Sequence, residues 1–484
     1  MSTCQRSAAE RVFQIIELAS LICSHLRRQE SAILLRVCSS LFLAARSFVW
    51  KKLLNVTPLI PLIPERHRND GTKAKLLNRD DIPRLYLYSP FIEVLELGDL
   101  HYYPRSDRKF WRILPRILRP AEALSGLRFL RWFSTDPIRE RELNRLRPFF
   151  VATLRGVYFS GQQNLALASG LLQALSLNCP SIKDMKIDLE VPTSHVAQEG
   201  ENASAHPKDV ASAYTEACIP ERLEQFRNLG SLSINQAVLE PRVLRTLSEL
   251  PHLRKLTIYP NREADMVLYP DYVLSGDCFL ALQSLALEHV DPYIINDLCT
   301  LTPLLRNLTS ASIWFEAEDR SAFWDQPSFK VNVLRELTGR ARQLTHLDIS
   351  MGSDDEEAWW SQSALNMLRS LPLRRLMIHI ATPDDYENAF SDLLDAIPDI
   401  EELQIAQAGL SSRSLRQAAI KVPKLRYLQV YAIDFDDLDT RPTSKDFSKP
   451  TIQPQTPLLI ECDDLFSSRN SPENLARLVK RYFG

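Results

Sequence analysis

The chain has 484 residues, of which 45% are hydrophobic and 24% are charged, as is ordinary for a globular protein. Its formal net charge of -2 gives no global field that would attract nucleic acid or an anionic membrane surface, so we expect neither partner. The eight cysteines form no C-x-x-C pair, and no stretch reaches the about 18 consecutive apolar residues of a membrane span. The N-terminus has no secretory leader pattern, and these features together predict reduced thiols and a cytoplasmic or nuclear location.

Residues 12–54 have helical periodicity and contain neither glycine nor proline. Leu18, Ile22 and Leu26 fall on one helix face, and two further apolar runs follow after a polar break. The pattern predicts three short helices. A module of about 43 residues has little room for a core of its own, so we expect its large apolar side chains to complete that core against a partner.

The order and spacing of certain residues in this module resemble the F-box family: Glu17-Leu18, Ile22, Leu26, Val37-Cys38, Trp50 and Leu53. Residues 10–56 would form the F-box, although Ile15 and Ile16 stand where a proline is usual and Ser31 stands where an apolar residue is common. The resemblance implies docking to the Skp-type adaptor of an SCF-type ubiquitin ligase, which is assembled on a cullin. The interface residues that it implies are Ile16, Leu18, Ile22, Leu26, Val37, Cys38, Trp50 and Leu53. A helical cap on a repeat array is the alternative interpretation.

A short repeated pattern follows a proline-rich segment, residues 57–90, that we predict to be a linker. The pattern apolar-x-x-apolar-x-apolar occurs twelve times, beginning with Ile92 and ending with the copy that starts at Leu425, mostly at intervals of 24–29 residues. The last two apolar positions are one residue apart, so they share a face of a short strand. The roughly twenty residues that remain in each copy suffice for a helix and a return loop. Prolines such as Pro180 and Pro251 end the helix before the next strand.

This repeat resembles the leucine-rich repeat family over residues 91–435. The implied fold class is α/β: an N-terminal three-helix F-box followed by an irregular leucine-rich repeat solenoid, with a curved parallel sheet inside and helices outside. The asparagine or cysteine that is usual three positions after the last strand residue occurs only as Asn261, so the repeats are irregular. A non-repeating α/β domain whose strands look alike is the alternative.

Three segments depart from the periodicity. Residues 191–213 account for the longest interval and are predicted to be a mobile insertion. The acidic run at residues 353–357 is typical of a solvated loop, and a phosphorylation site or a site for a basic partner remains open. Residues 436–484 are predicted to be a flexible tail with a terminal helix that begins after Ser471.

No sequence motif for catalysis, nucleotide binding or metal binding is present. The chain has no G-x-G-x-x-G, G-x-x-x-x-G-K, H-E-x-x-H or G-x-S-x-G, and its nine histidines are scattered. We therefore predict no catalytic, cofactor-binding or metal-binding residue, and a non-catalytic protein. An unrecognised enzyme would need polar groups that converge in one pocket, which the sequence does not indicate.

The strand residues between the buried positions point to the inner face of the predicted sheet, where a partner would bind. By this alternation the inner face includes Thr257, Glu288, Asp348, His379, Glu402, Gln404 and Gln429. The residues that we predict to contact a protein substrate are Lys255, Tyr259, Trp314, His346, Arg375, Tyr427 and Tyr431. These predictions make the chain the substrate-recognition subunit of a ubiquitin ligase, with a ligase-independent interaction scaffold as the alternative.

Overall fold

The computed structural model describes residues 15–64, 80, 82–98, 124–134, 139–161, 163–189, 217–260, 274–290, 292–315, 327–350, 361–379, 386–434 and 458–464. The chain divides into two compact units, Met1–Thr246 and Leu247–Gly484, which are described one at a time. The predicted insertion at 191–213, the acidic run at 353–357, Asn261 and the predicted terminal helix lie outside the described residues.

The N-terminal module contains the three predicted helices. They are α2 (Ile16–His25), α3 (Arg28–Leu34) and α4 (Ser39–Trp50). The polar residues between the first two helices cap the N-terminus of α3. The Arg27 backbone N–H donates to Glu30 Oε2 at 2.7 Å. None of the helices in the described residues is long and apolar enough to cross a membrane.

Residues 57–90, which we predicted to be a linker, contribute packed structure where they are described. They form η1 (Thr57–Leu62), α6 (Pro83–Tyr88) and most of η2 (Ser89–Phe91). Each of these helices has a proline in its first turn, where the missing N–H costs no hydrogen bond. Leu59, Ile63, Ile82 and Leu85 are fully buried. Pro58, Pro83 and Pro90 therefore mark the starts of packed helices.

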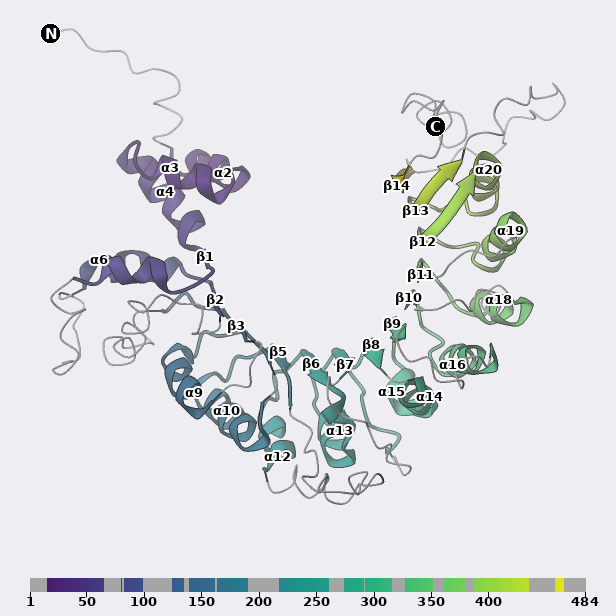
Figure 1. Cartoon of the computed structure of the whole chain (residues 1–484), viewed down its shortest axis with the longest axis horizontal. Helices are drawn as coiled ribbons and strands as arrows, with labels where there is room; N and C mark the ends of the chain where they lie inside the picture. The colour runs from purple at the N-terminus through teal and green to yellow at the C-terminus, as the bar shows by residue number, and fades with distance from the viewer. Residues whose placement is uncertain are drawn as a thin grey trace, which may run out of the picture. The chain divides into compact units, whose positions relative to one another are not determined.

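The first unit is built on a parallel sheet. Its strands pair in sequence order: β1 (Lys52–Leu53), β2 (Val94–Gly98), β3 (Phe129–Phe133), β4 (Gly156–Ser160), β5 (Asp184–Ile187) and β6 (Ser231–Asn235). The helical elements between and after them are α9 (Glu140–Leu146), η4 (Arg147–Phe149), α10 (Leu165–Asn178), α12 (Ile219–Glu224), η5 (Gln236–Leu239) and α13 (Pro241–Ser248), the last of which crosses the unit boundary. Helices α9, α10 and α12 lie on one side of the sheet (Figure 1).

The second unit repeats this plan. Its strands are β7 (Lys255–Tyr259), β8 (Ser284–Val290), β9 (Ser310–Phe315), β10 (His346–Ser350), β11 (Arg375–His379), β12 (Glu402–Ser411), β13 (Tyr427–Asp434) and β14 (Leu459–Asp464). Its helices are α14 (Pro292–Thr300), α15 (Thr302–Leu305), α16 (Pro327–Arg340), α18 (Gln362–Arg369), α19 (Tyr386–Ala396) and α20 (Ser412–Lys421). Helices α16, α18, α19 and α20 stand in a row on one side of the strands (Figure 1).

The twelve apolar triads of the sequence form the cores of both units. Each triad residue is buried, with at most 4% of its surface exposed. The strands pair in register, so that Leu347 of β10 lies beside Leu376 of β11 and Ile349 lies beside Ile378. Each such side chain contributes roughly 1.5–3 kcal/mol when it leaves water. The predicted α/β architecture, with a parallel sheet and helices, is confirmed.

Strand β14 lies inside residues 436–484, for which we predicted a flexible tail. It pairs in parallel with β13, with Leu428 beside Ile460 and Val430 beside Cys462. In the sequence, the position that corresponds to Leu425 is 457, and a proline stands there. The copy therefore lacks the leucine or isoleucine with which the other copies begin. The repeat array therefore continues past residue 435 to β14.

Asn235 connects two segments of the first unit that are distant in sequence. Its side chain is 2% exposed and receives the backbone N–H of Leu189 at 3.2 Å, while its Nδ2 donates to the Leu189 carbonyl oxygen at 2.5 Å. The amide thus satisfies both backbone groups of a fully buried residue.

We expect Asn235→Ala to lower the free energy of unfolding of this unit by about 2 kcal/mol, because two buried backbone groups lose their partner. The shift of the urea unfolding curve measures the effect. Asn228→Ala is the matched control: Asn228 is exposed and donates to the Pro180 carbonyl oxygen at 3.1 Å, so its loss should cost about 0.5 kcal/mol or less. Equal shifts for the two variants would contradict this account.

Candidate functional site

The core of the helical module consists mainly of small side chains. Ala19 and Cys23, one turn apart on α2, pack with Leu41, Ala44 and Ala45 of α4, and all five are buried. The larger residues Leu34, Leu35 and Phe48 are only partly buried against this cluster. The small residues let the helices approach closely, but they leave a core with little apolar area.

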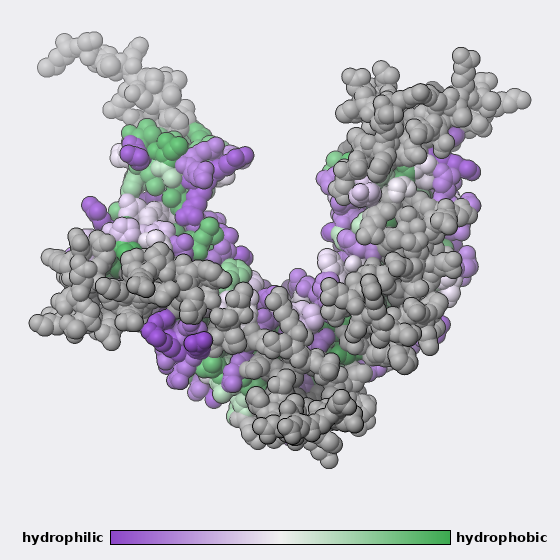
Figure 2. Space-filling model, in the orientation of Figure 1, coloured by the Kyte–Doolittle hydropathy of each residue, from purple (hydrophilic) through white to green (hydrophobic). Residues whose placement is uncertain are grey.

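Apart from the buried Leu41, the large apolar side chains of the module between residues 15 and 50 are at least partly exposed. Six of them form what we call the exposed apolar set, with exposed fractions between 39% and 66%: Ile15, Ile16, Leu18, Leu21, Ile33 and Val37. Hydrophobic residues are prominent on this module in the space-filling view (Figure 2). Large apolar groups gathered on one small module are typical of a surface that a partner covers.

The structure separates the eight predicted adaptor contacts into three groups. Ile16, Leu18, Val37 and Cys38 are exposed, and Ile22, Leu26 and Trp50 are partly exposed. Leu53 is fully buried in β1, where it pairs with Leu95, so its prediction as a surface contact was wrong. Leu21 and Ile33, at 57% and 66% exposed, belong to the exposed apolar set but were absent from the predicted interface. Their place in the apolar runs was the available signal.

Trp50, which is half-buried, packs against the segment that follows the module. Its ring stacks on Tyr88 of α6, with centroids 4.6 Å apart and planes inclined by 24°. Phe42 meets the same tyrosine edge to face at 6.1 Å, and the Arg46 guanidinium lies 4.6 Å above the Phe91 ring. These contacts and strand β1 fix α4 to the segments that follow it. Trp50 therefore has a role within the chain that the sequence did not predict, and its contact with an adaptor stays a prediction.

The inner face of the first unit is occupied by ion pairs. Glu96 Oε1 lies 2.9 Å from both Lys52 Nζ and Arg131 Nη1, and the Arg131 guanidinium lies 5.2 Å from the centre of the Tyr158 ring. Burial, and secondarily the charge of Asp184, raises the pKa of the Tyr158 phenol. The charges of this face therefore largely compensate one another.

The seven predicted substrate contacts all lie on strands of the second unit. Lys255, His346 and Tyr431 are exposed, and the other four are partly exposed: Tyr259, Trp314, Arg375 and Tyr427. Several have partners within the sheet. Arg375 Nε lies 3.4 Å from Glu402 Oε2, and the Tyr427 hydroxyl donates to Glu461 Oε2 at 2.7 Å. Some of the seven predicted contacts are thus already engaged within the sheet and are less available to a partner.

Trp314 lies at the centre of a group that we call the Trp314 cluster: His289, Ser312, Trp314, Asp348 and His379. The Trp314 Nε1–H donates to Asp348 Oδ2 at 3.1 Å, and the Ser312 hydroxyl donates to the same oxygen at 3.0 Å. The indole centroid lies 5.9 Å from the His289 ring and 5.6 Å from the His379 ring. Alternation placed Trp314, Asp348 and His379 on this face, but it did not predict their contacts or include His289.

The described side chains offer no group that resembles a metal site. Within those residues, no set of three or more histidine, cysteine, aspartate or glutamate side chains is placed to hold a metal ion. Burial raises the pKa of the Cys179 and Cys299 thiols to about 12, so these two thiols are poor nucleophiles. The features that the described residues do provide are two surfaces suited to binding: the exposed apolar set and the Trp314 cluster.

Comparisons with known proteins leave the family open. No protein-family model matches the chain, and no curated protein matches it. A Bacteroides fragilis crystal structure is similar at 16% identity and a TM-score of 0.28, over 58% of this chain and 66% of that one. The structure of TLR13 with ssRNA13 is similar at 12% identity and a TM-score of 0.25, over 74% of this chain and 59% of that one. At these scores neither likeness supports a functional argument.

We expect Tyr427 to keep its proton to unusually high pH. Burial and the Glu461 carboxylate that accepts its hydrogen bond raise its pKa to about 12. The contribution of this group to stability is therefore complete below the ordinary tyrosine pKa of about 10 and is lost as pH rises through about 12. An ultraviolet difference titration of the wild type against Tyr427→Phe should show this late phenolate. Glu461→Gln should move it to lower pH, and an unmoved titration would contradict the assignment.

Proposed function

We propose that this chain is the substrate-recognition subunit of an SCF-type ubiquitin ligase. In this proposal the helical module acts as an F-box that docks a Skp-type adaptor on a cullin-based ligase. The parallel sheets act as a leucine-rich repeat array that binds a protein substrate. Such a subunit needs no catalytic group, because it works by raising the concentration of the substrate near the enzyme that carries ubiquitin.

One observation carries the proposal: the core of the module consists mainly of small side chains, and most of its large apolar side chains are exposed or only partly buried. Ala19 and Cys23 of α2 are buried, whereas Leu18 and Leu21 of the same helix are 39% and 57% exposed. Full burial of an isoleucine, leucine or valine side chain is worth roughly 1.5–3 kcal/mol. Several such residues could offset the cost of association, which is of the order of 4–15 kcal/mol.

The joint around Trp50 supports the same role. A receptor that presents a substrate must hold its docking module and its first repeats in a defined relation. Here the stacking of Trp50 on Tyr88 and the pairing of β1 with β2 connect the module directly to the sheet of the first unit. Only Lys51 separates α4 from β1, so the docking helices continue directly into the first strand of the array.

The repeat pattern supports an array that binds along its strands. Each of the twelve copies supplies one parallel strand and buries its apolar triad, and most intervals between strands contain a helix within the described residues. A sheet of this kind presents successive side chains as rows, so an extended or folded partner can contact several repeats at once. Aromatic residues in these rows, such as Trp314 and Tyr431, are the types that dominate protein interfaces.

Leu18→Lys combined with Val37→Lys should weaken adaptor binding strongly. Both side chains are exposed, at 39% and 62%, so the fold should tolerate the change while a charge enters the docking surface. Co-purification of the full chain with a Skp-type adaptor is the measurement. We expect a stable complex with the wild type and at least about a tenfold loss of affinity with the variant.

Leu177→Lys provides the matched control, because Leu177 is 74% exposed on α10, outside the module. It should bind the adaptor as the wild type does. If the wild type fails to bind, or if the double variant binds equally well, the proposed docking is wrong. If the adaptor binds but turnover of the captured protein ignores cullin activity, the chain is a scaffold and not a ligase subunit.

A further inference from the structure

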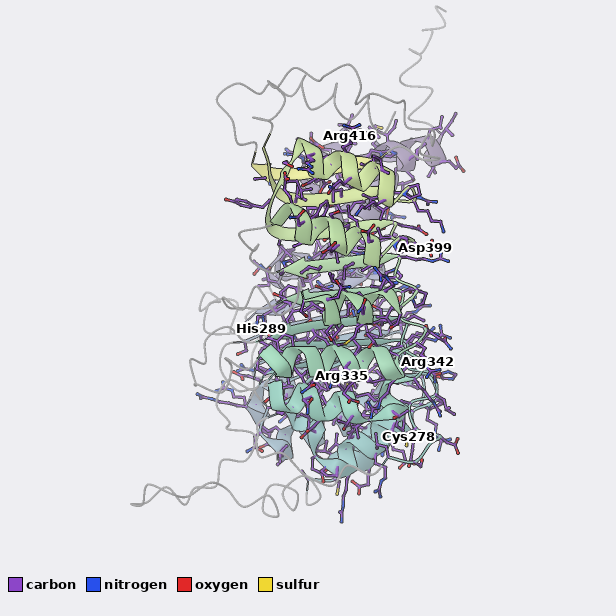
Figure 3. The ribbon with its side chains drawn as sticks, turned by 90° about the vertical axis from the view of Figure 1, so that its right-hand side faces the viewer. Cys278, His289, Arg335, Arg342, Asp399 and Arg416 are labelled. Carbon is purple, nitrogen blue, oxygen red and sulfur yellow. The ribbon has the colours of Figure 1, made fainter. Side chains whose placement is uncertain are left out.

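The Trp314 cluster lies toward the carboxyl ends of the strands in the second unit. Its members come from four consecutive strands, β8 to β11, and His289, Trp314 and His379 stand at or near the carboxyl ends of theirs. Figure 3 shows His289 at the edge opposite Cys278, Arg342 and Asp399, which belong to the turns that lead into strands. The cluster is therefore separate from the helix-to-strand turns and from the buried triads.

The indole of Trp314 is held in place by the sheet itself. Its Nε1–H donates to Asp348 Oδ2, which also accepts from the Ser312 hydroxyl. The His289 ring meets the indole edge to face, at an interplanar angle of 82°, and the His379 ring is tilted by 47°. A fixed and partly exposed indole loses little conformational freedom when a ligand binds to it.

His289 occupies an unfavourable backbone conformation. Its φ is 53°, in the left-handed region, and it lies at a bulge between Glu288, which pairs with Trp314, and Val290, which pairs with Phe315. Such a conformation costs of the order of 1 kcal/mol or more, and bulges of this kind often redirect a side chain beside a functional site. Here the residue at the bulge, His289, is the one whose imidazole contacts the Trp314 indole.

Two carboxylates, those of Asp348 and Glu288, lie beside these rings. Asp348 Oδ1 and His379 Nε2 are 4.0 Å apart and buried, and neither has a hydrogen-bond partner among the described residues. Glu288 is exposed next to Trp314 in the register. Arg375, the cation on β11, is already paired with Glu402. The cluster thus combines an electron-rich aromatic face with two carboxylates.

We propose that the Trp314 cluster binds a cationic side chain, lysine or arginine, of the polypeptide that this chain captures. The indole face attracts a cation through its quadrupole, and the carboxylates of Asp348 and Glu288 add a direct Coulomb attraction. An acidic side chain would be repelled by both. The inference rests on the proposed function only in taking the ligand to be a protein, and it names the chemistry by which the inner face selects it.

The test is a selection from a displayed library of random twelve-residue peptides with the full chain as bait. We expect the enriched peptides to contain more lysine and arginine than the input library. Fluorescence polarisation with the best of these peptides then gives Kd for wild type and variants. Glu288→Lys and Asp348→Asn should each weaken binding about tenfold, because each removes a carboxylate from the site.

Glu224→Lys makes the same charge change as Glu288→Lys at an exposed position on α12 of the first unit, and it should leave Kd unchanged. Unchanged thermal unfolding of each variant excludes a folding defect. The proposal is overturned if lysine and arginine are not enriched, or if the two cluster variants bind as tightly as the control. Leu18→Lys with Val37→Lys should retain peptide binding, so a failure of adaptor docking is seen separately, in co-purification.

Discussion

The strands of both units depend on one packing arrangement, in which each of the twelve apolar triads buries a turn residue and two strand residues beneath the same face. Leu344, Leu347 and Ile349 are an example, and each is at most 2% exposed. Because side chains alternate along a strand, His346 and Asp348 must then lie on the other face. Parallel pairing in register repeats this division on the neighbouring strands. The core therefore determines which residues are left for recognition, and the Trp314 cluster is assembled from them.

The helical module follows the opposite arrangement. Its interior is made by Ala19, Cys23, Ala44 and Ala45 around Leu41, while residues such as Leu21 and Ile33 are exposed. Ser31 is buried there, and its hydroxyl has no partner among the described atoms. A core of this kind contributes little stability by itself. The module is also fixed to the segments that follow it through Trp50 and β1.

The sequence predicted what local periodicity controls. The three helices and all twelve triads could be read from spacing alone, because each depends on residues only a few positions apart. Local periodicity did not predict features that depend on contacts between residues distant in the sequence. Trp50 is engaged by Tyr88, Leu53 pairs with Leu95, and β14 was hidden by Pro457 in the place of an apolar residue. The role of His289 depends on a bulge, which no alternation rule includes.

Hydrogen exchange of the full chain, with and without a Skp-type adaptor, tests the central claim most directly. The account predicts slower exchange of backbone amides in residues 15–26 and 31–38, where the exposed apolar set lies, when the adaptor is present. Residues 165–178 of α10, which carry the exposed Leu177, should exchange at the same rate in both states. Protection that is absent from the module, or that appears on α10 instead, would contradict the account.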